Sequence, residues 1–178
     1  MSCCVAFLRA VNVGKRRVAM ARLREEFEAL GFDEVSTYIN SGNVIFSASA
    51  SEPTGDLERR IEVRLEEAFG FVVTTFVRTA EEVREVAAYM PFGAVAEGET
   101  HMVAFLREPS TPAMGQAALA LSNSTDELVV HGREVHWLIH GSFMDTTLKP
   151  KHWKALGVQL TTTRNTTMLA KLAAKLES

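Results

Sequence analysis

The spacing of apolar residues along the chain predicts alternating helices and strands. In five stretches apolar side chains recur every three or four positions, the pattern of a helix with one buried face. These predicted helices cover residues 20–30, 57–69, 80–90, 112–121 and 168–176. Runs rich in β-branched and aromatic residues predict strands at residues 4–8, 35–39, 43–47, 71–77, 102–106, 126–130, 133–139 and 158–163. The stretch 143–157 is predicted to be partly helical and interrupted at Pro150.

The five letters VAFLR occur twice, at residues 5–9 and 103–107. Each copy begins the same predicted order of elements, strand–helix–strand–strand–helix–strand, so we predict an internal duplication. Two ordinary apolar strands with convergent sequences are the alternative. An acidic stretch containing glycine and alanine follows Pro91 and is the predicted junction. It divides the chain into halves at residues 1–91 and 92–178.

This order of elements predicts an α+β fold of two tandem ferredoxin-like (βαββαβ) halves, with mainly antiparallel sheets and an added C-terminal helix. The strands at 4–8, 43–47 and 102–106 are apolar at successive positions, which indicates sheets that are covered on both faces. Either the other half or a second copy of the chain can supply that cover. A monomer and a homodimer are therefore both open.

Composition and charge narrow the classes of function. The net charge is −3 and the sequence pI is near 6.0, whereas wholesale nucleic-acid binding usually leaves a basic footprint. No apolar run approaches the ~20 residues of a membrane span, and no signal peptide is expected. Cys3 and Cys4 are adjacent, so they are poorly placed for a disulfide and lack the spacing of metal ligands. We therefore expect a cytoplasmic protein with reduced cysteines and no contact with a membrane.

A glycine-containing loop at residues 9–17, here called the cation loop, leads from the first predicted strand into the first predicted helix. Its candidate ligand-binding residues are Arg9, Asn12, Gly14 and Lys15. Backbone N–H groups and the dipole at a helix N-terminus favour negative charge, so the loop is a candidate site for a small anionic or phosphorylated ligand. It lacks the glycine and hydroxyl spacing of a Walker loop. A solvated turn whose cations pair with acids of the following helix explains the same residues.

Two further candidates, Arg164 and Asn165, precede the last predicted helix. Asn165 or Thr163 suits the N-cap position, but a cation beside a helix N-terminus is unfavourable. Arg164 therefore calls for a carboxylate in a structural salt bridge or for an anionic ligand. The residues of the hairpin at 38–43 have ordinary turn chemistry. We expect this hairpin at the opposite end of its sheet from the cation loop.

The histidines and serines show no catalytic or metal-binding pattern. His136 and His140 share a strand face but lie ~13 Å apart, too far for one metal ion. Ser41 and Ser142 lack the flanking glycines of a nucleophile elbow. No set of acid, base and nucleophile is visible, and we predict no cofactor and no metal. The alternatives to anion binding are a nucleic-acid-binding module, which the charge disfavours, and a structural or protein-interaction module without a ligand.

Two long motifs resemble one bacterial family. LRAVNVGKRRVAMARLREEFEALGFDEVSTYINSGNVIF, at residues 8–46, closely resembles the opening of the domain-of-unknown-function family numbered 1697. TTTRNTTMLAKLA, at residues 161–173, resembles the C-terminal motif of the same family. The chain departs from the usual residues of that family at Ala10, Lys15, Asn40 and Thr166. The resemblance implies a compact cytosolic α+β protein and implies no reaction.

Overall fold

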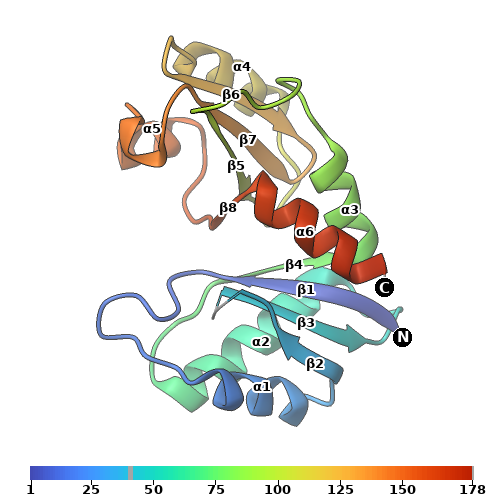
Figure 1. Cartoon of the computed structure of the whole chain (residues 1–178). Coiled ribbons are helices and arrows are strands. Elements are labelled where there is room, and N and C mark those ends of the chain that lie inside the picture. Colours follow the sequence, from blue (N-terminus) through green and yellow to red (C-terminus); the bar gives the residue numbers. More distant parts are fainter. Residues whose placement is uncertain (40–41, 178) are drawn as a thin grey trace. The chain divides into compact units, whose positions relative to one another are not determined.

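The computed structural model describes residues 1–39 and 42–177, and the chain forms two compact units (Figure 1). The first unit contains Met1–Arg84 and Lys175–Ser178, and the second contains Glu85–Ala174. Each unit contains one four-stranded antiparallel sheet with helices, so the α+β class is confirmed. The boundary between residues 91 and 92 stays a prediction. None of the helices within the described ranges is long and apolar enough to cross a membrane.

The sheet of the first unit has the strand order β2-β3-β1-β4, and neighbouring strands are antiparallel. Its strands are β1 (Ser2–Leu8), β2 (Asp33–Thr37), β3 (Asn43–Ala48) and β4 (Thr75–Thr79). Helix α1 (Met20–Ala29) connects β1 to β2, and helix α2 (Thr54–Phe69) connects β3 to β4. Because β3 is antiparallel to both β1 and β2, the latter two strands run in the same direction.

The hydrophobic core of the first unit lies between the sheet and helices α1 and α2. Apolar residues of both helices are buried at the spacing that the sequence predicts, namely Leu23, Phe27, Leu57, Ile61 and Leu65. They share one cluster with Cys4, Ala6 and Leu8 of β1. Each fully buried leucine or phenylalanine contributes roughly 1.5–3 kcal/mol. The intervening residues Val5 and Phe7 are buried as well, as expected for a strand that is covered on both faces.

The sheet of the second unit has the strand order β6-β7-β5-β8 and is also antiparallel. Its strands are β5 (Thr100–Phe105), β6 (Asp126–His131), β7 (Glu134–Ile139) and β8 (Thr163–Asn165). Helix α4 (Pro112–Leu121) connects β5 to β6, whereas β7 and β8 are connected by the 3-10 turn η2 (Phe143–Asp145) and the short helix α5 (Pro150–Ala155). Pro150 begins α5 instead of interrupting a helix, because the first helical position needs no backbone N–H.

The strand predicted at residues 158–163 is wrong, since β8 begins only at Thr163. Val158 packs in the core of the second unit instead of pairing with a neighbouring strand. Thr161 Oγ1 donates a hydrogen bond to the Phe105 carbonyl at 2.8 Å, and the Phe105 N–H donates to the Thr162 carbonyl at 3.0 Å, so only the end of this segment lies beside β5. A β-prone sequence forms a strand only as far as its backbone has a partner.

A helix directly follows the last strand of each sheet. These helices are α3 (Ala80–Ala88), after β4, and α6 (Thr166–Glu177), after β8. The helix predicted as an addition to the second half therefore has a counterpart after the first. The VAFLR segments also occupy matching places, because Val5 pairs with Arg78 of β4 and Val103 pairs with Arg164 of β8.

Candidate functional site

One asparagine folds the cation loop back on itself. Asn12 has a left-handed backbone conformation with φ of 57°, which asparagine tolerates better than most residues. Its Nδ2 donates to the Val18 carbonyl at 3.1 Å, and its Oδ1 accepts from the Val18 N–H at 2.7 Å. Gly14 is also left-handed, with φ of 62°. Asn12 thus positions the loop, and both polar groups of its side chain are already engaged.

Two of the four cationic side chains of the loop have polar or ring contacts with the described residues, and two do not. Arg17 Nη1 donates to the loop backbone at 3.0 Å, and the Arg16 guanidinium lies 5.1 Å from the centre of the Phe71 ring. Arg9 and Lys15 are exposed, and neither side chain forms a hydrogen bond or ion pair with a residue in the described ranges. Arg9 and Lys15 are therefore the loop cations that are available to a ligand.

The acids of α1 do not neutralise the cation loop. In the described part of the chain they pair with arginines of α1 and α2, as Arg22–Glu25, Arg22–Glu26, Arg64–Glu26 and Arg24–Glu28. Helix α1 also begins without an acidic residue in its first turn and without a side-chain cap at Ala19. No carboxylate of its own first turn therefore compensates the partial positive charge at its N-terminus.

The β2–β3 hairpin lies at the same end of the sheet as the cation loop, and the predicted placement at the opposite end is wrong. Asn43, at the start of β3, pairs with Phe7, near the end of β1. The crossover helix α1 explains this placement. It carries the chain back to the other end of the sheet before β2 begins, so the C-terminal ends of β1 and β2 lie at the same end of the sheet. The Tyr38 N–H and Asn43 Nδ2 close the hairpin with hydrogen bonds of 3.0 Å. The predicted turn residues Asn40 and Ser41 lie outside the described residues.

A cavity of about 330 Å³ lies where the first turns of α1 meet the end of β2. It is lined by Met20, Ala21, Arg24, Ser36 and Thr37. The backbone N–H groups of the first helical turn, the guanidinium and the two hydroxyls are all hydrogen-bond donors. The volume is at the lower end of the range for small-molecule pockets. Such a set of donors suits the oxygens of a phosphate or carboxylate.

The two candidates of the second unit have local structural partners. Asn165 Oδ1 accepts from the Met168 N–H at 2.7 Å, which is the bond of an N-cap. Arg164 Nη1 donates to Thr162 Oγ1 and to the Thr163 carbonyl, each at 2.8 Å, and burial lowers the pKa of Arg164 to about 10. The predicted site residues are thus divided between the units: Arg9, Asn12, Gly14 and Lys15 belong to the first, Arg164 and Asn165 to the second.

A buried arginine that the sequence analysis missed occupies the matching position in the first unit. Arg78 of β4 is buried, and its Nη1 donates to the carbonyl of the preceding residue at 3.0 Å. Arg164 of β8 makes the same contact. Each arginine pairs with the valine of a VAFLR segment and stands two residues before a helix. The two arginines stand at different distances from their VAFLR segments in the sequence, so aligning the halves on VAFLR alone does not reveal this correspondence.

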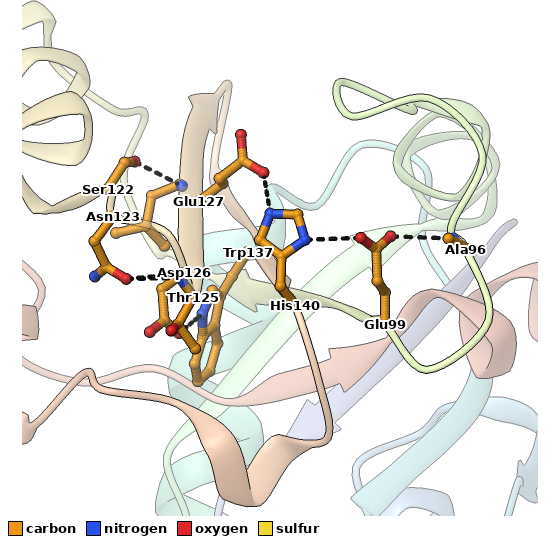
Figure 2. Close-up of polar contacts among 10 residues, drawn as sticks. Ala96, Glu99, Ser122, Asn123, Thr125, Asp126, Glu127, Trp137 and His140 are labelled. Carbon is orange, nitrogen blue, oxygen red and sulfur yellow. Dashed lines mark hydrogen bonds and ion pairs between the residues drawn. The ribbon is translucent and has the colours of Figure 1, made fainter.

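An exposed histidine of the second unit is held between two carboxylates (Figure 2). His140 Nδ1 lies 2.7 Å from Glu99 Oε1, and His140 Nε2 lies 2.5 Å from Glu127 Oε2. The hydrogen bonds to Glu99 and Glu127 raise the pKa of His140. Glu99 also accepts from the Ala96 N–H at 3.1 Å, so the bridge fastens the segment before β5 to strand β6.

A pair of histidines is buried between β5 and β7. His101 Nε2 and His136 Nδ1 are 3.1 Å apart, and burial lowers the pKa of both side chains. In the first unit, burial raises the pKa of the Cys4 thiol to about 11, which makes it a poor nucleophile at neutral pH. Among residues 1–39 and 42–177 no group of three or more His, Cys, Asp or Glu side chains is placed to hold a metal ion.

Comparison with known proteins supplies a family and a fold. The family model described as "Protein of unknown function (DUF1697)" matches residues 1–136, a range that includes the first long motif and ends before the second. The solved structure of the conserved bacterial protein SP0830 from Streptococcus pneumoniae is similar, with a TM-score of 0.73 and 23% sequence identity. That match covers 100% of this chain and 99% of that chain, and it concerns the fold alone. No curated protein matches the chain.

Proposed function

The chain belongs to DUF1697, a family of proteins of unknown function; from the geometry of the first unit, we propose that this unit binds a small anionic or phosphorylated ligand. The cavity of about 330 Å³ at the start of α1 carries this proposal. Residues of the first helical turn line it together with Arg24, Ser36 and Thr37, whose side chains carry hydrogen-bond donors. Arg9 and Lys15 add positive charge at the same end of the sheet.

In the proposed site some groups contact the ligand, and others fix the conformation of the cation loop. Anion oxygens accept hydrogen bonds from the first turn of α1 and from Arg24, whose ion pair with Glu28 is exposed and long at 3.6 Å. Exchanging such a surface pair for a ligand costs little. Asn12 fixes the path of the cation loop through Val18, and Lys15 supplies a mobile positive charge. Binding is the whole of the proposed activity.

We also propose that the two units are ferredoxin-like repeats that arose by internal duplication. Four shared features support this: the element order, the strand order, the place of VAFLR and the buried arginine before a helix. In the first unit β1 lies between β3 and β4, and in the second β5 lies between β7 and β8. Convergence would have to reproduce all four features independently.

Thermal melting and calorimetry with inorganic phosphate, ribose 5-phosphate and a short RNA test the proposed site. A ligand at 100 times its Kd stabilises the folded state by about 2.7 kcal/mol, which raises the Tm by roughly 5–11 °C for a chain of this size. We expect Arg24→Ala and Lys15→Ala to weaken binding of the phosphate compounds by about 10- to 100-fold each, from the loss of one charge-assisted hydrogen bond. Lys171→Ala, an exposed cation of α6, is the matched control.

Three outcomes separate the possible functions. Selective binding of a phosphate compound that is weakened in both variants and kept in the control supports the proposal. Tighter binding of RNA, with an affinity that falls steeply as salt rises, would instead support the nucleic-acid alternative. Absence of binding, or equal binding by all variants, would refute the anion site and leave the structural module.

A further inference from the structure

The helix layer of the second unit is incomplete beside β8. In the first unit the 16-residue helix α2 connects β3 to β4, whereas the matching connection in the second unit contains only the turn η2 and the six-residue helix α5. A cavity of about 320 Å³ lies at this place, between β7, η2, α5 and the segment that leads into β8. Its volume suits a small molecule.

Three aromatic rings form the walls of this cavity, which we call the aromatic cavity. Trp137 of β7 is 3% exposed and forms its inner wall, while Phe143 of η2 is 51% exposed and stands at its mouth. The Trp137 ring meets the Phe143 ring at 61° and the Trp153 ring at 72°, with centroid distances of 5.7 and 5.4 Å. These edge-to-face contacts hold the three lining rings in fixed orientations, and a cavity lined by aromatic rings suits an apolar aromatic group.

The polar groups of the aromatic cavity favour a negative charge on that ligand. Lys149 lines the cavity and has no carboxylate within ion-pair distance in the described part of the chain. Thr163 also lines it, and its hydroxyl makes no hydrogen bond with the described residues. From Thr146 to Leu176 the chain contains six lysines and arginines and no aspartate or glutamate. Aromatic cages for quaternary ammonium groups need the opposite electrostatic environment.

A buried carboxylate keeps the inner wall of the cavity in place (Figure 2). Asp126 of β6 accepts from Trp137 Nε1 at 2.8 Å and from Thr146 Oγ1 at 2.5 Å. It also accepts from the N–H and the hydroxyl of Thr147, at 2.9 and 2.7 Å. Burial raises the pKa of Asp126, but these hydrogen bonds outweigh burial and leave the pKa below its usual value. All four donors are thus held by one charge, so Asp126 is a positioning residue for Trp137 and the loop.

The exposed phenylalanine at the mouth is also held by a built turn. Asp145 Oδ2 accepts from the N–H and the hydroxyl of Ser142, at 2.7 and 2.9 Å, and closes η2 around Phe143. Gly141 permits this turn, because its φ is 152° and a Cβ there would lie 2.6 Å from Asp145 Oδ2. A turn that fixes an aromatic side chain at the surface loses the apolar burial that an inward position would provide. Contact with a ligand in the cavity would restore it.

We propose that the aromatic cavity binds a small aromatic carboxylate. The ligand ring lies against Phe143, Trp153 and the inner Trp137, and its carboxylate accepts hydrogen bonds from Lys149 and Thr163. A free phosphate fits poorly, since it would leave three aromatic walls without an apolar partner. This site is independent of the anion site proposed in the first unit, and neither needs the other.

Tryptophan fluorescence can detect binding in this cavity, because the two tryptophans of the chain, Trp137 and Trp153, both line it. Titration with sodium benzoate, followed by tryptophan emission, should give a saturable change with a Kd on the order of a millimolar. Ligand-observed NMR of benzoate with the same protein detects binding that leaves emission unchanged. Lys149→Gln should weaken benzoate binding by about tenfold or more. Phe143→Ala should do the same, and it tests the ring contact at a half-exposed residue.

The comparison probes and one control variant decide the result. Lys154→Gln removes a neighbouring cation of α5 that does not line the cavity, and it should bind benzoate as the parent does. Benzyltrimethylammonium and inorganic phosphate should leave tryptophan emission unchanged. Absence of saturable benzoate binding by both methods would overturn the proposal. So would undiminished binding by Lys149→Gln, or a tighter response to benzyltrimethylammonium than to benzoate.

Discussion

Acid should weaken the second unit through one buried histidine. His136 is fully buried on β7, and its Nδ1 lies 3.1 Å from His101 Nε2. The other nitrogens of the pair, His136 Nε2 and His101 Nδ1, are buried without a hydrogen-bond partner within the described residues. One proton between the rings makes the single hydrogen bond that joins two neutral side chains, and the outer nitrogens stay unpaired. A further proton would charge a buried ring that has no carboxylate within ion-pair distance among the described residues.

The size of the effect follows from the shift in pKa. Burial first, then the neighbouring His101 and His131, lower the pKa of His136 from 6.5 to about 3. Between these pH values His136 is protonated in the unfolded chain and neutral in the folded chain. The free energy of unfolding is therefore at its full value above pH 6.5 and falls as the pH drops toward 3. From His136 alone the loss is about 2 kcal/mol at pH 5 and about 4 kcal/mol at pH 3, at about 1.4 kcal/mol per pKa unit.

Urea unfolding followed by tryptophan emission measures this loss in the unit that contains both tryptophans. His136→Phe keeps an aromatic ring but cannot titrate. It should be less stable than the parent at neutral pH by about 1–3 kcal/mol, because His101 Nε2 loses its partner. Between neutral pH and pH 5 it should lose about 2 kcal/mol less than the parent. His152→Gln, which changes a histidine outside the pair, is the control.

Parallel pH dependences of the parent and His136→Phe would refute this reasoning. An NMR titration in which the His136 ring gains its proton near pH 6.5 in the folded protein would refute it independently. The exposed His140 cannot produce the same trend. Its pKa is raised by Glu99 and Glu127, so its contribution is full at low pH and declines as the pH rises through its folded pKa.

Three substitutions test other contacts. Asp126→Asn should lower the free energy of unfolding by about 3–5 kcal/mol, because buried donors that include Trp137 Nε1 lose a charged acceptor; an unchanged urea midpoint would contradict this. Asn12→Ala should cost about 1–2 kcal/mol and speed hydrogen exchange at the Val18 amide, whose acceptor it removes; parental protection of that amide would count against it. Gly141→Ala should lower the Tm, since its Cβ would meet a carboxylate oxygen at 2.6 Å, at about 1–3 kcal/mol of strain; a parental melting curve would show that the turn yields freely.

Periodicity was sufficient for the elements whose stability is local and repetitive. The stripe through Leu57, Ile61 and Leu65 predicts α2 because a helix with one buried face needs that spacing. The α+β class and the two antiparallel sheets follow from the order of such elements. The segment 158–163 failed because the signal for a strand is also the signal for any buried extended segment. Whether a backbone partner exists is a property of the whole sheet.

The error about the hairpin has a different origin, since the needed rule was available from the sequence. A helix between two strands of one sheet carries the chain back across the sheet, so β1 and β2 are parallel and finish at the same end of the sheet. This rule, applied correctly, places the residues after β2 next to the cation loop and the start of α1. The two halves of the first family-like motif, around Asn12 and around Asn43, then belong to one neighbourhood.

Register decides the remaining contacts, and it is the quantity that a single sequence specifies least. His136 and Trp137 are neighbours on β7, so they point to opposite faces of the sheet. Trp137 faces the core cluster and the aromatic cavity, while His136 contacts His101 on the other face. A slip of one residue between β5 and β7 would exchange these two environments. The buried histidine pair and the aromatic cavity therefore depend on the same strand pairing, and a change that disturbs one through the backbone should disturb the other.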